Sequence, residues 1–156
     1  MPMDEKTTIS LLGNEYSLLQ QFYEDFDKRI LGIKGWSATV AIAAIGGGFY
    51  QTRLLWLFAA GASLVFWLLE TIWKGFQYCY SPRIELLERV FREDKFEDVA
   101  PFQIGKSWYK EFQKNGYQMF SNFKLPIVWF PHGVTLILGL LLYLFEAFHL
   151  ITIARK

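Results

Sequence analysis

The sequence predicts an all-α integral membrane protein with three transmembrane helices, an N-terminal amphipathic helix and a small cytosolic helical segment. Two apolar stretches, 35–50 and 54–73, are joined by only three polar residues, Gln51, Thr52 and Arg53. Each stretch is close to the ~20 residues that cross a hydrocarbon core of about 30 Å as a helix. Hydrophobic residues make up 53% of the 156 positions and charged residues 20%, and the two kinds are segregated along the chain. These observations indicate a transmembrane hairpin.

Residues 1–34 are expected to form a cytosolic amphipathic helix. Acidic side chains outnumber basic ones here, whereas helices that lie on a membrane surface are usually rich in Lys and Arg. We therefore expect this helix to pack against protein, with the membrane surface and an oligomer seam as the alternatives. Its apolar residues recur every three or four positions, which is the helical period. They are Leu12, Tyr16, Leu19, Phe22 or Tyr23, Phe26, Ile30 and Ile33.

The hairpin, 35–73, carries small residues on both of its helices. In the second helix they form the run 59–63. In the first they recur at spacings of four, three and four, which places them on one face. These residues are Ser37, Ala41, Ala44 and Gly48. Because surfaces without bulky side chains let two backbones approach closely in lipid, we expect the two helices to pack through these faces.

Three consecutive glycines, Gly46, Gly47 and Gly48, have two interpretations. The first is close packing of the hairpin helices. The second is a hinge or pore-lining step, because successive glycines loosen a helix. On the second interpretation all three are candidate pore or gating residues.

The segment 74–125 is expected to be cytosolic and helical. Pro82 should interrupt the helix that leaves the hairpin. Beyond it, Ile84, Leu87 and Phe91 share one face of a solvated amphipathic helix. The stretch 93–104 is acidic, contains a proline and has no sustained period, so it is predicted to be a loop.

A second helix of this segment, 106–124, combines aromatic and basic residues. Lysines occur at Lys106, Lys110 and Lys114, and aromatic rings at Trp108 and Tyr109. Aromatic rings stack on bases and lysines bind phosphates, so these five residues are candidates for binding a nucleotide signal or a protein partner. The alternative is that the aromatic residues form a membrane-boundary belt and the core of a small cytosolic bundle.

The last apolar stretch is too long for one straight crossing, since residues 126–154 would span about 43 Å as a helix. Pro131 and Gly133 divide it. We therefore predict a short interfacial piece at 126–132 and a third transmembrane helix at 133–153. His132 is expected to lie at the membrane interface without a functional role.

Two ionisable residues, Glu146 and His149, lie within the predicted third span and share a helical face. An unpaired charge in lipid is costly, so an ionisable residue in a span indicates a functional site. We expect Glu146 to line a cation pathway in a homo-oligomer, with His149 gating it by protonation. The alternative is a structural role, in which the two residues form a hydrogen-bonded pair or a protonated Glu146 bonds a neighbouring helix.

The positions of Lys and Arg indicate the orientation. All lie on the side of the N-terminus and the 74–125 segment, except Arg53, Arg155 and Lys156. By the positive-inside rule the N-terminus is cytosolic and the C-terminus is outside. The formal net charge of +1 gives no reason to expect bulk nucleic-acid binding.

The sequence contains no motif of a catalytic, metal or cofactor site. It has no Gly-rich phosphate loop, no HExxH, no CxxC and no nucleophile motif. The two histidines are distant from each other in sequence, and the lone Cys79 cannot form an internal disulfide. We therefore expect no enzymatic activity, no metal and no cofactor.

The order of these segments resembles that of small bacterial multi-pass membrane proteins of the SLATT-like kind. The resemblance covers roughly residues 15–88. It consists of an acidic amphipathic helix, the entry KGWSAT into a small-residue span, a three-residue turn, and an exit through FWLLETIWKGFQYCYSPRIELLE. The third predicted span is a departure from that pattern.

The resemblance implies a function in the bacterial inner membrane. Proteins of this kind are thought to be anti-phage effectors that oligomerise into pores, or otherwise disrupt the membrane, when a nucleotide signal or a partner activates them. The expectation is therefore a multi-pass, homo-oligomeric effector or pore whose cytosolic segment receives the signal. The alternative is a non-conducting membrane scaffold that recruits a cytosolic partner.

Overall fold

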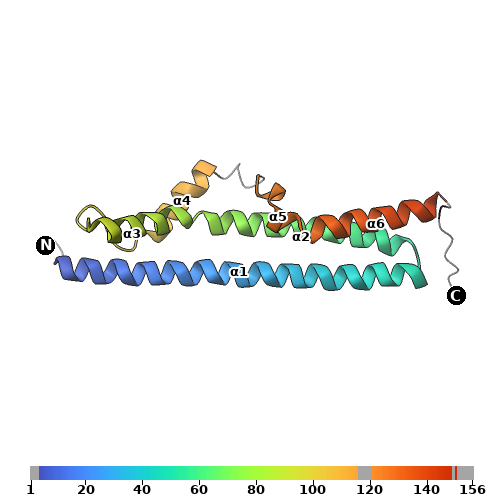
Figure 1. Ribbon diagram of the computed structural model, residues 1–156, viewed down its shortest axis with the longest axis horizontal. Helices are drawn as coiled ribbons and strands as arrows, with labels where there is room; N and C mark the ends of the chain where they lie inside the picture. Colours follow the sequence, from blue (N-terminus) through green and yellow to red (C-terminus); the bar gives the residue numbers. More distant parts are fainter. Residues whose placement is uncertain (1–3, 116–120, 149, 151–156) are drawn as a thin grey trace. The chain divides into compact units, whose positions relative to one another are not determined.

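The computed structural model describes residues 4–115, 121–148 and 150, and these residues form helices and no β-strand. The all-α prediction is therefore confirmed for this part of the chain. Figure 1 shows the helices in chain order. They are α1 (Glu5–Tyr50), α2 (Leu54–Tyr78), α3 (Ser81–Glu93), α4 (Ile104–Asn115), α5 (Pro126–Trp129) and α6 (His132–Ala147).

The chain divides into two compact units. Unit 1 consists of Met1–Lys28 and Trp73–Met119, and unit 2 of Arg29–Ile72 and Phe120–Lys156. Helices α1 and α2 each contribute to both units. The predicted segment boundaries lay after residues 34, 73 and 125, whereas the units divide after 28, 72 and 119.

Unit 1 has a small apolar core formed by α1, α3 and the loop that follows α3. Its buried residues are Leu12, Leu19, Ile84, Leu87, Val90 and Phe96. The face predicted for the N-terminal helix therefore points inward, and at its ambiguous position Tyr23 packs against this core while Phe22 is exposed.

The predicted breaks in unit 1 occur where the sequence placed them. Helix α2 ends at Tyr78 and α3 begins at Ser81, with Pro82 in its first turn, where the missing N–H of proline costs nothing. Helix α3 ends at Glu93 and is capped by Asp94 in the left-handed conformation. Helix α4 begins at Ile104, so residues 94–103 form the expected loop.

Unit 2 packs its helices through small residues, as predicted for the hairpin. On α1 the four residues of the small face are buried, and on α2 Ala59, Ala60 and Ser63 are buried. Helix α6 joins them at Gly139, where an added Cβ would lie 2.6 Å from the backbone oxygen of Trp56. Only glycine permits this approach of α6 to α2.

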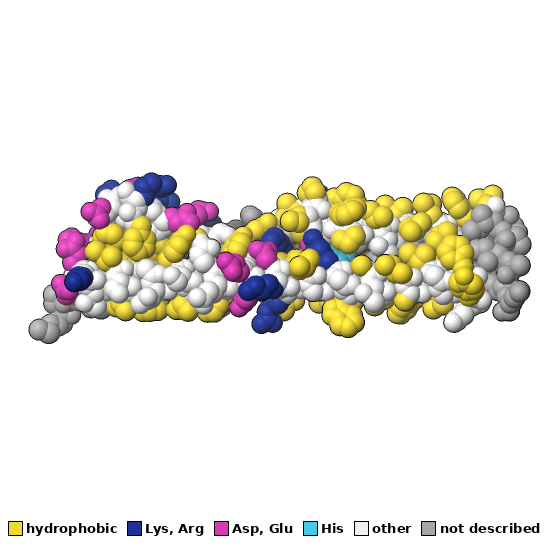
Figure 2. Space-filling view, turned by 60° about the horizontal axis from the view of Figure 1, so that its bottom comes forward, with side chains coloured by type: hydrophobic (Ala, Val, Ile, Leu, Met, Phe, Trp, Pro, Cys, Tyr) yellow, Lys and Arg dark blue, Asp and Glu magenta, His cyan; other side chains and the backbone are white. Residues whose placement is uncertain are grey.

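Two helical stretches of the described chain, Glu5–Tyr50 and Leu54–Glu93, are long and apolar enough to be candidate membrane spans. Helix α6 has 16 residues, which is about 24 Å at 1.5 Å per residue. It ends at Ala147, earlier than the predicted third span, of which residues 149 and 151–153 lie outside the described part. Figure 2 shows charged side chains gathered over unit 1 and hydrophobic side chains over unit 2.

Candidate functional site

Four polar residues of unit 2 form one hydrogen-bonded group, which we call the His132 network: Lys34, Ser37, Glu70 and His132. His132 Nε2 lies 2.9 Å from Glu70 Oε2, and His132 Nδ1 lies 2.8 Å from Ser37 Oγ. Lys34 Nζ lies 3.2 Å from Glu70 Oε1 and donates to the carbonyl oxygen of Ile127. The network therefore joins α1, α2, α5 and α6.

The helical elements explain why these side chains meet. Lys34 and Ser37 are three residues apart on α1 and so lie on one side of it. Glu70 lies near the end of the apolar part of α2. Pro131, with its fixed φ, precedes His132, which is the first residue of α6. The turn between α5 and α6 thereby brings the imidazole against the other two helices.

Three members of the network are almost completely buried. Ser37 is 2% exposed, Glu70 1% and His132 0%. Burying an ionised group costs several kcal/mol unless it is paired and hydrogen-bonded. Here both carboxylate oxygens of Glu70 and both ring nitrogens of His132 have partners. No buried side-chain nitrogen or oxygen in the described residues lacks a partner.

The residue types Ser37, His132 and Glu70 are also those of a hydrolytic triad. A triad requires a serine hydroxyl that a carbonyl substrate can reach and backbone N–H groups that bind the oxyanion. Ser37 is buried in the interior of α1, whose N–H groups are engaged in the helix. The geometry therefore fits a buried site that binds protons or holds helices together better than one for acyl transfer.

Sequence reasoning missed this site. It expected His132 at the membrane interface without a functional role and did not count Glu70 among the candidate site residues. His132, Glu70 and Lys74 are all buried, and sequence reasoning did not anticipate the hydrogen bond that joins His132 to Glu70. The signal was available, since an ionisable residue in an apolar stretch suggests a site. That reasoning was applied only to Glu146 and His149.

The structure describes one of the two predicted pore residues of the third helix. Glu146 is half-buried in the last turn of α6, and His149 lies outside the described residues. Glu146 follows His132 by 14 positions, which is about 21 Å of helix, so the two residues lie at opposite ends of α6. The guanidinium of Arg53 lies 5.7 Å from the ring centroid of Tyr143, so the Glu146 end of α6 is near the α1–α2 turn.

The three glycines of α1 have different surroundings. An added Cβ at Gly48 would lie 2.0 Å from Trp56 Nε1, and one at Gly47 would lie 2.9 Å from Leu55 Cδ1. At Gly46 an added Cβ would meet nothing within 4 Å. Gly48 therefore serves the close packing of α1 on α2. That these three glycines also gate a pore stays a prediction.

The candidate signal-binding residues lie on α4 of unit 1. Lys106, Tyr109, Lys110 and Lys114 are exposed, and the three lysines form no ion pair within the described residues. Trp108 differs from them, because its Nε1 donates to the carbonyl oxygen of Phe76 at 3.1 Å. Its ring also stacks on Phe112, with centroids 5.1 Å apart. Trp108 thus attaches α4 to α2, while the other four residues remain accessible.

A second buried ionic group holds unit 1 together. Arg83 Nε and Nη2 donate to the two carboxylate oxygens of Glu15 at 2.9 and 2.8 Å. Arg83 also donates to the carbonyl of Ala100, and the backbone N–H of Phe102 donates to Glu15. These bonds fasten the loop 94–103 to α1 and α3. Glu15 is completely buried, which the sequence analysis did not anticipate.

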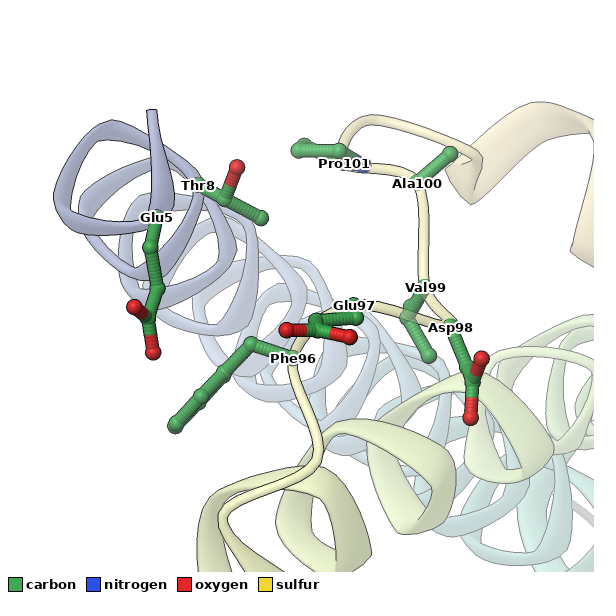
Figure 3. Close-up of a pocket in the computed structure, with 8 residues that line it drawn as sticks. All are labelled: Glu5, Thr8, Phe96, Glu97, Asp98, Val99, Ala100 and Pro101. Atoms are coloured by element: carbon green, nitrogen blue, oxygen red, sulfur yellow. The ribbon is translucent and has the colours of Figure 1, made fainter. Parts of the chain in front are cut away.

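Unit 1 contains a cleft of about 590 Å³ between the first turns of α1 and this loop (Figure 3). Glu5 and Thr8 line it from α1, and residues 96–101 line it from the loop. Figure 3 shows the side chains of Glu97 and Asp98 pointing in different directions. Because these carboxylates diverge, they do not converge on a single cation.

Burial also affects the titrating groups at the junction of α2 and α3. It raises the pKa of the Cys79 thiol above its ordinary range, with a further contribution from the negative charge of Glu111. Burial likewise raises the pKa of the neighbouring Tyr80. A thiol held in its protonated form is a poor nucleophile, so Cys79 is suited to packing.

A comparison of the chain with models of known protein families, with curated proteins and with solved structures finds no match.

Proposed function

We propose that this protein is a three-span membrane protein of the bacterial inner membrane that acts as a signal-gated, homo-oligomeric effector or pore. In this proposal residues 1–34 and 74–125 are cytosolic. Residues 35–50, 54–73 and 133–153 cross the membrane. The order of segments over residues 15–88, which resembles SLATT-like proteins, supports an anti-phage role.

The observation that carries the proposal is the reversed polarity of unit 2. Its surface bears large apolar side chains, including Leu31 at 71%, Trp36 at 68% and Ile42 at 74% exposure. Its interior contains the ionisable residues Glu70 and His132. Large apolar patches of this kind are rare on water-soluble monomers and are the normal surface of a protein in lipid.

The composition of the apolar helices supports the same assignment. Between residues 35 and 69 the single charged residue is Arg53, in the turn between α1 and α2. Between 125 and 148 the single Asp, Glu, Lys or Arg is Glu146. A buried, fully partnered network is also the form in which ionisable groups are tolerated at membrane depth.

The gating mechanism is a population shift. A signal that binds the cytosolic segment more tightly in the open arrangement than in the closed one moves the equilibrium toward opening. The exposed face of α4, with Lys106, Tyr109, Lys110 and Lys114, is the proposed receiver. Its lysines suit an anionic signal such as a nucleotide.

The same face favours the second candidate function, a scaffold that recruits a cytosolic partner without conducting ions. Three lysines without ion pairs in the described residues form a surface that an acidic protein can bind. A scaffold leaves the membrane potential intact, and this difference separates the two functions.

The test measures membrane potential with a voltage-sensitive dye, and growth, in bacteria that express the protein, with and without phage. Wild type, Glu146→Ala and Glu85→Ala are compared at equal amounts in the membrane fraction. Glu85 is an exposed carboxylate on α3 and serves as the matched control. We expect depolarisation by wild type and Glu85→Ala and a weaker effect for Glu146→Ala. If no condition depolarises the cells, the pore is excluded and the scaffold is favoured.

A further inference from the structure

His132 has hydrogen-bond partners that suit both charge states of its ring. In the neutral ring, Nε2–H donates to Glu70 and Nδ1 accepts from the Ser37 hydroxyl. In the charged ring, both nitrogens donate, and the Ser37 hydroxyl becomes the acceptor. The hydroxyl hydrogen is then available to a carbonyl of the preceding turn of α1. A proton can therefore bind at Nδ1 without the loss of either hydrogen bond.

The two states differ in net charge. With Lys34 and Glu70 ionised, the network is neutral while His132 is neutral and carries +1 once His132 is protonated. The extra charge is buried between Glu70 and Ser37, and Lys34 on the other carboxylate oxygen repels it. An uncompensated buried charge costs several kcal/mol, whereas water stabilises the same charge.

Among the residues that the structure describes, Glu70 is the charged group with which His132 forms a hydrogen bond or ion pair. Helix α5 contributes the carbonyl of Ile127 and has no titratable side chain. Lys124, before α5, is exposed and also positive. On α6 itself the acidic residue is Glu146, about 21 Å away along the helix.

We propose that His132 is a proton-binding site whose occupancy controls how firmly α6 is held against α1 and α2. The proton comes from water and binds at His132 Nδ1 when the start of α6 has separated and exposes the ring; while α6 is packed, the most accessible member of the network is Lys34, whose side chain is 21% exposed. Because a network of net charge +1 is more stable in water than inside unit 2, proton binding favours the arrangement in which the start of α6 has separated. Acidification therefore loosens α6.

The proposal goes beyond the proposed function and is independent of it. It concerns the packing of α6, and it holds for a scaffold as well as for a pore. It also differs from the sequence-based expectation that His149 is the residue that responds to pH. The chain has two histidines, so each serves as the control for the other.

The test is hydrogen–deuterium exchange of the full-length protein in lipid nanodiscs at pH 8, 7, 6 and 5. The amides of residues 135–138, the first hydrogen-bonded amides of α6, are followed, and the intrinsic pH dependence of exchange is corrected with an unstructured peptide of the same sequence. We expect the protection of these amides to fall about tenfold from pH 8 to pH 5, the range in which histidines change charge. Protection that does not change with pH overturns the proposal.

Variants then assign the response to His132. His149→Gln should retain the fall in protection, and His132→Gln should abolish it. The opposite result, with the fall lost in His149→Gln and kept in His132→Gln, assigns the response to His149 and overturns the proposal.

Lys34→Gln provides a second test, which keeps the proposal falsifiable if His132→Gln does not fold. Without Lys34, protonated His132 neutralises Glu70, so acidification should now raise the protection of residues 135–138. A merely structural role for His132 predicts no such reversal. If Lys34→Gln loses protection on acidification as wild type does, the charge argument is wrong. Loss of membrane depolarisation plays no part in this readout, so failure of the pore and failure of the proton site are distinguishable.

Discussion

Substitution of Gly48 by alanine tests how closely α1 and α2 pack. The added methyl group would lie 2.0 Å from Trp56 Nε1 and 2.3 Å from Trp56 Cδ1, so the ring has to move. The ring is completely buried, is in edge contact with Phe49, and donates from Nε1 to the carbonyl of Ile45 at 2.9 Å. Its displacement would cost both packing and this hydrogen bond.

The expected magnitude follows from these contacts. Overpacking costs about 1–3 kcal/mol, and loss of the Trp56 hydrogen bond about 1 kcal/mol. Exchange of glycine for alanine in a helix returns up to about 1 kcal/mol. The net destabilisation is therefore roughly 2 kcal/mol, which corresponds to a fall in Tm of about 4–8 °C for a chain of this length.

Gly46→Ala is the matched control, because an added Cβ at Gly46 meets nothing within 4 Å. This variant should gain helix stability and raise Tm by about 1–4 °C. Thermal unfolding of both variants, followed by circular dichroism in the same detergent, measures the difference. A Gly48→Ala protein as stable as Gly46→Ala would refute the packing interpretation. If the three glycines instead act as a hinge of a pore, Gly46→Ala should reduce membrane depolarisation without loss of stability.

Three further predictions concern other contacts. Arg83→Ala leaves the Glu15 carboxylate buried without its partner. This variant should lower the free energy of unfolding, measured in denaturant, by about 3–5 kcal/mol. A loss below about 1 kcal/mol would contradict the buried ion pair. Gly139→Ala places a methyl group against the Trp56 backbone oxygen and should lower Tm. Gly61→Ala is its control and should not lower Tm, because the space around Gly61 is open. Equal Tm values for the two variants would argue against the contact of α6 with α2. Burial raises the pKa of the Cys79 thiol, so maleimide should react with Cys79 more slowly at pH 7.5 in the folded protein than in the unfolded protein. The reaction rate of the folded protein should rise with pH beyond 9. Equal rates for the folded and unfolded protein would show that the thiol is accessible and easily ionised.

Local features of the fold were predictable from the sequence. The small-residue face that contains Ser37 and Gly48 follows from helical spacing alone, and it is buried as expected. Pro82 and Pro131 act on their immediate neighbours, and helices α3 and α6 begin beside them. A proline affects the backbone of its immediate neighbours, so the segment around it is enough to predict that a helix begins or ends there.

The networks could not be predicted in the same way. Ser37 and His132 are 95 residues apart, and Glu15 and Arg83 are 68 apart. Which polar side chain enters a core depends on the partner that another helix brings to it, and periodicity within one helix does not encode that partner. For this reason the sequence analysis did not anticipate the burial of Glu15 and Glu70. Trp108 was predicted only in part. The sequence indicated an aromatic residue of the core or of a binding site, but it did not indicate the hydrogen bond from Trp108 to the carbonyl oxygen of Phe76.

Cysteine labelling in intact bacteria tests whether the chain crosses the membrane three times with its N-terminus in the cytosol. In a Cys79→Ser background, single cysteines are introduced as Thr52→Cys in the α1–α2 turn, Lys110→Cys on α4 and Lys156→Cys at the C-terminal end, and cells are treated with a membrane-impermeant maleimide. We expect labelling of Thr52→Cys and Lys156→Cys in intact cells, and of Lys110→Cys only after the inner membrane is permeabilised. Labelling of Lys110→Cys in intact cells, protection of Lys156→Cys, or recovery of the protein in the soluble fraction would contradict it.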